Sequence, residues 1–164
     1  MKAEDFMRLA IQAAQDAKAA GGVAIGAVLV EESTGTVVAS GESLVGVTKD
    51  PTAHAEVGAI RAASQQLGTD DLFGYTLYST LEPCHMCLSA AAWARIPRIY
   101  FGAYRKDVDP SLFDTIGTPG DEQEAAHMNL RENTGMRVQG GVLEADCAAL
   151  LAGYHDGPKH SVIE

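Results

Sequence analysis

The feature that most constrains this chain is LEPCHMC, residues 81–87, because it places two cysteines two residues apart where a loop meets a helix. Alternating residues before it predict a strand over 75–79, and the small-residue run at 89–92 after it predicts a helix. On a first helical turn Cys84 and Cys87 can point the same way, and the positive end of the helix favours two thiolates. Such a pair suits zinc, which binds Cys sulfur and His nitrogen tetrahedrally.

The cellular setting decides how these thiols are used. The chain has 164 residues and three cysteines, its first residues carry acidic groups without an apolar signal-peptide core, and no run approaches about 18 apolar residues. We therefore expect a cytoplasmic protein with no membrane partner. Disulfides are not expected in a reducing compartment. Metal binding or redox work is left for Cys84 and Cys87.

The charge of the chain bears on its partners. Asp and Glu number 22 against 12 Lys and Arg, which gives a net charge of −10, and no basic cluster stands out. Nucleic-acid binding rests on basic side chains that neutralise phosphates. A large nucleic-acid substrate is therefore disfavoured, although a local basic patch remains open.

Hydrophobic periodicity predicts alternating strands and helices. Strands are expected at 23–30, 37–40, 75–79, 98–101 and 136–142, helices at 4–20, 51–67, 85–93 and 143–154, and loops at 41–49 and 104–128. The predicted core face of the first helix is Phe6, Leu9, Ala10, Ala13 and Ala17, and that of the second is Val57, Ile60, Ser64 and Leu67. This order indicates an α/β domain with helices covering a mixed sheet. We expect a single domain over 1–164, with an ordered core at 1–157 and a loosely held tail at 158–164.

A third metal ligand is suggested by His54 in THAE-like residues 52–56, at the start of the second helix, where Asp50 reads as the N-cap. Two helix N-termini meet at one metal if the helices lie side by side on one face of the sheet. Three protein ligands leave the fourth zinc position to water, whose pKa falls to about 7. Glu56 is then available to move protons, although residues two apart diverge on an ideal helix.

His-x-Glu followed by Pro-Cys-x-x-Cys is the signature of the zinc base deaminases. The segments DPTAHAEVGAIRAA (50–63) and TLYSTLEPCHMC (76–87) resemble the two zinc segments of the cytidine deaminase-like superfamily. Similarity to its guanine deaminase and tRNA adenosine deaminase branches extends over about residues 4–155. The resemblance implies a three-layer α/β/α fold with a central five-stranded mixed sheet, usually a homodimer or larger. It also implies zinc on His54, Cys84 and Cys87, with Glu56 as the catalytic proton carrier.

The resemblance also suggests substrate contacts. Trp93, in the sequence WAR, matches a tryptophan that lines the base pocket in the guanine deaminase branch, and Phe113-Asp114 matches a Phe-Asp pair there. An Asp carboxylate can accept hydrogen bonds from a ring N–H and the adjacent amine. Tyr154 is expected to close the pocket, and Glu132 is a candidate second proton carrier by looser resemblance. Packing for Trp93 and Tyr154, and a cap for Asp114, stay open as alternatives.

One departure from the family pattern concerns the substrate. Where the family usually reads Gly-x-Asn after the second strand, this chain has Gly41-Glu42-Ser43. A serine offers one hydroxyl in place of a carboxamide, so the contact of Ser43 with a base is weaker or bridged by water. Unusual or analogue bases are consistent with this change.

These observations predict hydrolytic deamination of a free nucleobase or analogue of guanine, triazine or cytosine type, releasing ammonia. A tRNA adenosine deaminase and a cytidine or nucleoside deaminase are the alternatives within the superfamily. A structural zinc module would need a fourth ligand, for which His85 is the nearest candidate, and a thiol-redox protein would join Cys84 to Cys87. Cys147 is expected in the core.

Overall fold

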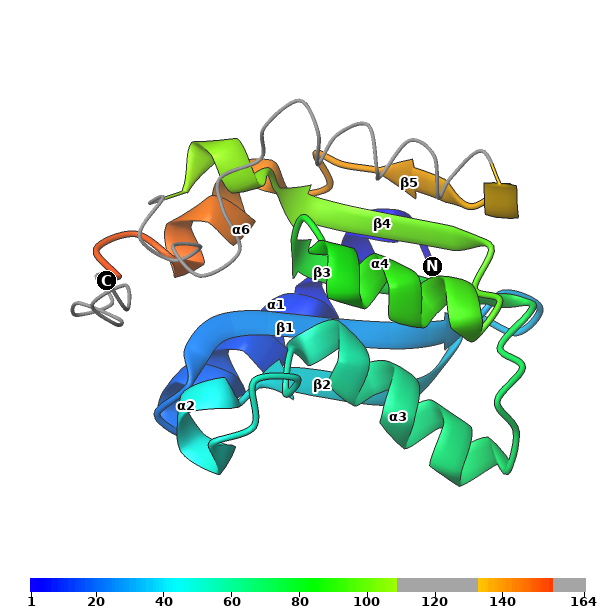
Figure 1. Cartoon of the computed structure of the whole chain (residues 1–164). Helices are drawn as coiled ribbons and strands as arrows, with labels where there is room; N and C mark the ends of the chain where they lie inside the picture. Colours follow the sequence, from blue (N-terminus) through cyan, green and yellow to red (C-terminus); the bar gives the residue numbers. More distant parts are fainter. Residues whose placement is uncertain (109–132, 155–164) are drawn as a thin grey trace.

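The computed structural model describes residues 1–108 and 133–154. Within them one sheet of five strands runs in the order β2-β1-β3-β4-β5 (Figure 1). The strands are β1 Val23–Glu31, β2 Thr36–Ser43, β3 Tyr75–Leu81, β4 Arg98–Ala103 and β5 Arg137–Gln139. β1 pairs antiparallel with β2 and β3, whereas β4 pairs parallel with β3 and β5. The predicted mixed five-stranded sheet is confirmed, although β5 is shorter than the predicted 136–142.

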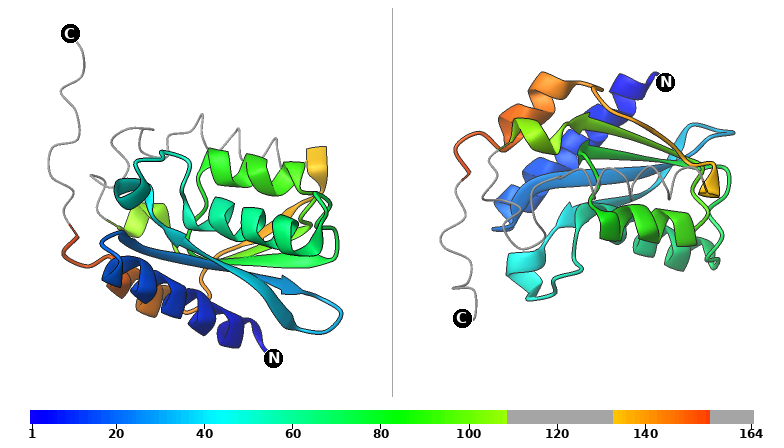
Figure 2. Two further views of the ribbon diagram at one scale, coloured as in Figure 1. Left: turned by 90° about the horizontal axis from the view of Figure 1, so that it is seen from below. Right: turned by 45° about the horizontal axis from the view of Figure 1, so that its top comes forward.

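The helices form two layers on opposite faces of this sheet. They are α1 Ala3–Ala19, α2 Val45–Thr48, α3 Ala55–Leu67, α4 His85–Trp93 and α6 Glu144–Leu150, with a 3-10 turn η1 at Arg105–Asp107. α1 and α6 cover one face, and α3 and α4 lie side by side on the other (Figure 2). The predicted three-layer α/β/α architecture is therefore confirmed.

α1 packs directly on β1 because both surfaces are small. Its N-terminus is capped locally, since the Lys2 N–H donates to the Asp5 carboxylate at 2.8 Å. A Cβ at Gly26 would overlap the backbone of Ala10 and Ala14, so glycine allows the close approach. The buried residues of this helix are Phe6, Met7, Ala10, Ala13, Ala14 and Ala17. Leu9 is exposed, and its predicted place in the core is wrong because it lies one position outside that stripe.

The start of α3 corrects the predicted helix boundary. The helix begins at Ala55 rather than at 51, and Asp50 instead caps a turn in which the Thr52 N–H and hydroxyl both donate to its carboxylate, at 2.8 and 2.7 Å. These hydrogen bonds lower the pKa of Asp50. Asp50 therefore accepts hydrogen bonds from the backbone and side chain of Thr52 as predicted for a cap, but it forms an Asx turn and is not the N-cap of α3.

The buried face of α3 also differs from the prediction. Its buried residues are Ala55, Glu56, Ala59 and Ala63, whereas Val57, Ile60, Ser64 and Leu67 are half-buried or exposed. The reason is a close approach to β2, because a Cβ at Gly41 would overlap the backbone of Ala55 and Ala59. Small side chains must face this contact, so the alanines occupy it and the larger residues turn outward.

Two further segments complete the fold. The predicted loop at 41–49 is wrong in part, because β2 continues to Ser43 and α2 follows it. Cys147 is buried in α6 against Gly102, where a Cβ would overlap its sulfur, and the predicted core position is confirmed.

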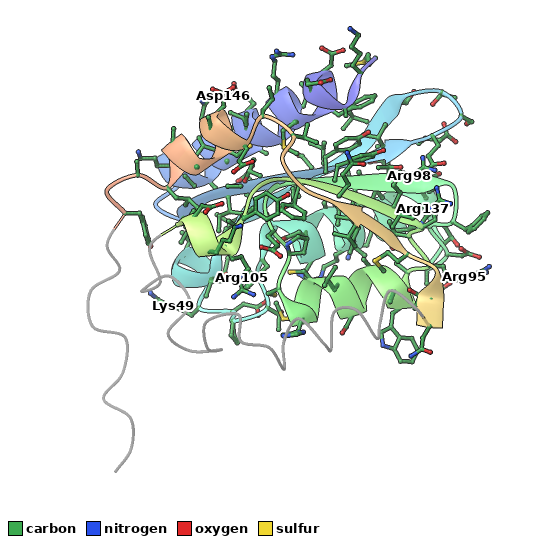
Figure 3. All side chains as sticks on the ribbon, turned by 90° about the horizontal axis from the view of Figure 1, so that it is seen from above. Lys49, Arg95, Arg98, Arg105, Arg137 and Asp146 are labelled. Atoms are coloured by element: carbon green, nitrogen blue, oxygen red, sulfur yellow. The ribbon has the colours of Figure 1, made fainter. Side chains whose placement is uncertain are left out.

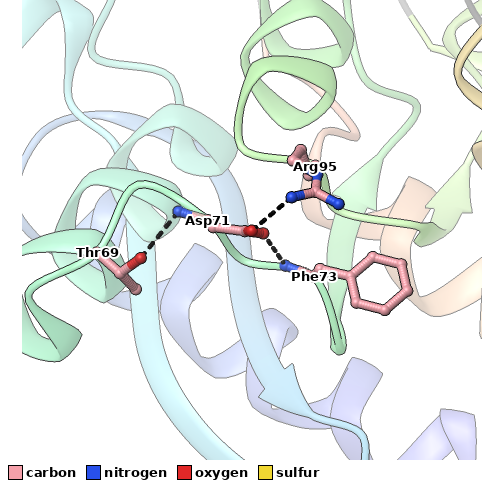
Figure 4. A network of polar contacts seen from close by, with 4 residues as sticks. All are labelled: Thr69, Asp71, Phe73 and Arg95. Carbon is pink, nitrogen blue, oxygen red and sulfur yellow. Dashed lines mark hydrogen bonds and ion pairs between the residues drawn. The ribbon is translucent and has the colours of Figure 1, made fainter.

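A polar network joins the far ends of α3 and α4 (Figure 4). Arg95 follows α4 and donates to Asp71 at 2.6 Å, and the same carboxylate accepts the Phe73 N–H at 3.0 Å. The Asp71 N–H donates to the Thr69 hydroxyl at 3.1 Å. The loop between α3 and β3 is thereby tied to α4, which helps fix how the two helices lie against each other.

Candidate functional site

The site lies where the N-termini of α3 and α4 meet on the same face of the sheet. His54 and Cys84 are the N-cap residues of these helices, and each has an extended backbone. N-caps are usually Ser, Thr, Asp or Asn, whose oxygens bond the free N–H groups of the first turn. Neither His54 nor Cys84 makes such a side-chain bond. Both helices therefore give up a stabilising cap to place a potential metal ligand.

The donor atoms of these residues fit the edges of a zinc tetrahedron. His54 Nδ1 lies 3.6 Å from Cys84 Sγ and 3.5 Å from Cys87 Sγ, and the two sulfur atoms are 3.5 Å apart. Zn–S bonds of about 2.3 Å and Zn–N bonds of about 2.0 Å at tetrahedral angles put such atoms roughly 3.5 to 3.8 Å apart. The three side chains can hold one zinc ion without rearrangement of the helices.

The number of ligands favours an open site. Among the described residues, one group of three or more potential ligands has donor atoms close enough for a metal, and it consists of His54, Cys84 and Cys87. His85 is not part of that group, which removes the nearest fourth ligand for the structural-zinc alternative. A site with three protein ligands has a position for water or substrate, as catalytic zinc sites do.

Glu56 reaches the same site, and the backbone of His54 explains how. His54 is not helical, so the angle of about 200° between residues two apart on a helix does not apply to this pair. An N-cap side chain folds over the first turn towards the second and third helical residues, and Glu56 is the second. Glu56 is only 4% exposed, and the Ser79 hydroxyl donates to its Oε1 at 3.2 Å.

The ionisable side chains of the site change one another's pKa values strongly. The hydrogen bond from Cys87 and the neighbouring His54 lower the pKa of Cys84 to about 3, against the opposing effect of burial, while the pKa of Cys87 is raised. Burial and the charge of Cys84 raise the pKa of Glu56. The hydrogen bond with Cys84 raises the pKa of His54. A thiolate beside a carboxyl group whose pKa is raised is suited to metal binding and proton transfer.

Three residues near the site were not predicted from the sequence. Ser79 is 0% exposed and contacts Glu56. The alternation of side chains along β3 places Ser79 on the same face as Leu77, and this alternation is the sequence pattern that could have indicated it. Glu82, beside the cysteine loop, accepts the Arg105 N–H at 3.0 Å. Arg105 is buried, and its positive charge acts on His54 in the direction that lowers the pKa. A buried arginine after β4 carries no sequence signal of its own.

Ser43 lies beside the segment that leads to His54. It is buried at the end of β2, and the next N–H, that of Leu44, donates to the Ala53 carbonyl at 3.0 Å. The backbone therefore brings Ser43 next to the segment that carries the first ligand. Its contact with a substrate stays a prediction.

Of the other expected substrate residues, the structure describes Trp93 and Tyr154. Trp93 is 88% exposed at the end of α4 opposite to Cys84, so the alternative that it packs in the core is wrong. The reason is helical phase, because α4 buries Ala91 and a residue two positions later points the opposite way. The contact of Trp93 with a base stays a prediction. Tyr154 is half-buried beyond α6. Phe113, Asp114 and Glu132 lie outside the described residues.

The fold and this donor group define a class, the zinc-type hydrolytic deaminases. Three protein ligands supplied by two helix N-termini, with a buried carboxylate beside them, match the His-x-Glu and Pro-Cys-x-x-Cys pattern of that class. The sequence model of the cytidine and deoxycytidylate deaminase zinc-binding region matches residues 1–103. The chain belongs to this family, and it is a zinc-dependent deaminase.

The similar proteins include deaminases named for two different substrates. A tRNA-specific adenosine deaminase from Haemophilus influenzae is 35% identical over 153 residues, which span 92% of this chain and 82% of that protein. A guanine deaminase from Bacillus subtilis is 41% identical over 115 residues, 70% of this chain and 72% of that protein. The solved guanine deaminase from Nitrosomonas europaea superposes with a TM-score of 0.77 at 27% identity, covering 90% of this chain and 81% of that one.

The described helices were compared with the length and hydrophobicity that a membrane-spanning helix needs. Over residues 1–108 and 133–154, none of the helices combines the length and apolar character needed to cross a bilayer.

Proposed function

We propose that this protein hydrolyses the exocyclic amine of a small free nucleobase of guanine type, or a close analogue, and releases ammonia. The observation that carries the proposal is the donor group of His54, Cys84 and Cys87 beside a buried Glu56. Deamination of a cyclic amidine needs a nucleophile made from water and a group that moves protons within one dry pocket. Both requirements are met by these four side chains.

The chain's own residues have distinct roles in the proposed reaction. Zinc held by His54, Cys84 and Cys87 would supply a water of pKa about 7 as the nucleophile. Glu56 accepts a proton from the attacking water and gives it to the ring nitrogen next to the amine-bearing carbon. Glu56 then takes the remaining proton from the hydroxyl group on the attacked carbon and passes it to the amine. The C–N bond breaks as the carbonyl group forms, and ammonia leaves. Its burial excludes bulk water from these transfers.

The distribution of charge supports a small substrate over a polyanion. The chain carries a net charge of −10. Among the basic residues labelled in Figure 3, Lys49 and Arg105 lie towards one end of the sheet and Arg95, Arg98 and Arg137 towards the other. Arg95 and Arg98 already pair with carboxylates, at 2.6 and 3.2 Å. Phosphate binding needs basic groups gathered along one path, and these are divided.

A second candidate function is deamination of adenosine in tRNA. The observation in its favour is that the Haemophilus influenzae tRNA deaminase matches 92% of this chain, whereas the Bacillus subtilis guanine deaminase matches 70%. The exposed Lys49 at one end of the sheet is a basic residue that can make a local phosphate contact.

The proposal also includes assembly as a homodimer. Trp93 and Phe73 are large apolar side chains with 88% and 66% of their surface exposed. A second copy of the chain that packs here would cover these residues. Light scattering during gel filtration tests this part independently of activity.

One variant and one substrate panel test the proposed function. Glu56→Gln is expected to retain one zinc per chain and to lose turnover by about a thousandfold, because proton transfer is removed. Ammonia release is measured on guanine, 8-azaguanine, cytosine, a diaminotriazine, guanosine and adenosine-containing tRNA. An active Glu56→Gln enzyme would contradict the assigned role. Turnover of tRNA alone would replace the free base with the second candidate.

A further inference from the structure

We propose that Ser79 is a positioning residue for Glu56 and assigns different tasks to its two carboxylate oxygens. The hydroxyl holds Oε1 by a hydrogen bond and leaves Oε2 to carry the proton between water and base. This inference rests on the proposed function of Glu56. It adds a residue outside the His-x-Glu and Pro-Cys-x-x-Cys segments of the motif.

The direction of the hydrogen bond follows from the neighbours of Ser79. Its Oγ donates to Glu56 Oε1 at 3.2 Å and accepts the Leu81 N–H at 3.4 Å. An accepted N–H occupies a lone pair of the hydroxyl, so the hydroxyl hydrogen is directed to the carboxylate. Ser79 and Glu56 are 0% and 4% exposed, so water does not compete for the bond.

The bond from Ser79 persists when the metal site is filled. A cysteine that ligates zinc gives up its proton. The hydroxyl of Ser79 keeps its proton, because it is not one of the three ligands. In the loaded enzyme Ser79 therefore still orients the carboxylate.

Ser79 is held by a rigid part of the sheet. It lies in the central strand β3, with Ala27 of β1 opposite on one side and Phe101 of β4 on the other. A donor on a paired central strand moves little, so it can fix the side chain of Glu56 within a narrow range. The helix supplies the carboxylate and the sheet supplies its orientation.

The next residue of the same strand provides a matched control. Thr80 is also buried, but it faces the α1 side, where its hydroxyl accepts the Gly26 N–H at 3.1 Å. Loss of either hydroxyl leaves a buried polar group without its partner and lowers stability. Only the Ser79 hydroxyl touches a group of the site.

The test compares Ser79→Thr with Ser79→Val, which have the same shape and differ by the hydroxyl. With the base that the substrate panel identifies, we expect the kcat of Ser79→Val to fall roughly ten- to a hundredfold below that of Ser79→Thr, with KM within about threefold. Both variants should bind one zinc per chain. Crystals of the two zinc-loaded variants should show the same metal ligands, with Glu56 held in one orientation in Ser79→Thr and its carboxylate displaced in Ser79→Val.

Four measurements separate this inference from the proposed function. Equal kcat values for Ser79→Thr and Ser79→Val would show that Ser79 only packs, and the inference would be wrong while the role of Glu56 stood. Ser79→Ala, which adds no volume, serves if the larger side chains prevent folding, and it should lose kcat as Ser79→Val does. Thr80→Val should lower the melting temperature and leave kcat within about twofold. In a Glu56→Gln background, removal of the Ser79 hydroxyl should have no further effect on the residual rate.

Discussion

On both faces of the sheet an alanine-rich helix lies directly against a glycine of a strand. α1 approaches β1 at Gly26, beside the backbone of Ala14, and α3 approaches β2 at Gly41, beside the backbone of Ala59. Each face also buries cysteine, with Cys147 on the α1 side and Cys87 on the α3 side. The packing of the two faces is therefore alike, yet among the described residues only the α3 and α4 face gathers a potential metal centre.

The difference lies at the helix N-termini. The N-cap of α1 is the exposed Lys2, and the nearby carboxylate of Asp5 neutralises the first turn of this helix. The N-cap of α3 is the half-buried His54, and Glu56 is buried in the first turn of this helix. A helix N-terminus carries partial positive charge, and when it points into the protein it favours thiolate and carboxylate groups there. The two faces therefore differ in the position of their helix N-termini and not in how the helices pack. Among the described residues, only the α3 and α4 face has N-termini that point into the protein beside ionisable groups.

The largest effect is expected from removing a thiol on each face. Cys87→Ala should lose zinc, because two ligands do not hold the ion, and activity should fall by more than about a thousandfold. Cys147→Ala should keep both zinc and turnover while losing about 1 kcal/mol of stability through the small cavity left in the core. Metal analysis, ammonia release and urea unfolding measure these effects. Zinc loss in Cys147→Ala would break the contrast between the faces.

The paired glycines sharpen the same contrast. Gly41→Ala and Gly26→Ala should each destabilise the fold by about 1–3 kcal/mol, because the added methyl group overlaps helix backbone on either face. Only Gly41→Ala displaces the helix that carries His54, so only this variant should also bind zinc more weakly. Competition with a chromophoric chelator measures the affinity. Gly46→Ala, where a Cβ meets no atom within 4 Å, is the control.

Stability should decrease at alkaline pH through the α1 face. Burial, with a smaller effect of Asp146, raises the pKa of Cys147 to about 12, and burial, with a smaller effect of Tyr100, raises the pKa of Tyr78 to about 12. Both groups hold their protons more tightly when folded than when unfolded, where their pKa values are about 8.5 and about 10. Their contribution is full below about pH 8.5 and is lost as the pH rises towards 12.

Urea unfolding of the zinc-loaded protein measures this loss. We expect a decrease of roughly 1–2 kcal/mol between about pH 8 and about pH 10, most of it absent in Cys147→Ala. A free energy of unfolding that stays constant over this range, in the presence of bound zinc, would contradict the prediction.

The smallest effect is expected at the opposite ends of α3 and α4. Asp71→Asn weakens the bond to Arg95, but the two side chains are 44% and 64% exposed, and surface ion pairs contribute less than about 1 kcal/mol. Stability should change within that limit, while zinc content and kcat stay unchanged. A kcat reduced severalfold would show that the network of Figure 4 transmits its position to the site.

Much of the site could be predicted from the sequence because its ligands sit at helix starts. The spacing of Cys84 and Cys87 matches the N-cap and third residue of a helix, and this geometry is local. The alternation of strands and helices likewise predicted the mixed sheet. The position of Glu56 was harder to predict, because it depends on the extended backbone of His54. The sequence pattern placed the start of α3 four residues too early.

The remaining features depend on contacts between distant segments. The buried face of α3 is set by Gly41, which is 14 residues before Ala55 and lies in another element. Ser79 acts on a residue 23 positions away, so the pattern of its own strand indicates its face but not its partner. Trp93 could not be placed by its residue type, because the phase of α4 decided its exposure.

The separation of His54 and Cys84 has a further consequence. The two residues are 30 positions apart, and the segment between them contains all of α3 and β3. An ion that binds both residues crosslinks the chain. A crosslink that closes a loop of this length lowers the entropy of the unfolded chain and so adds about 3–4 kcal/mol to the free energy of unfolding. Zinc supply would then set how much of the protein survives proteolytic quality control, in addition to how much of it turns over substrate.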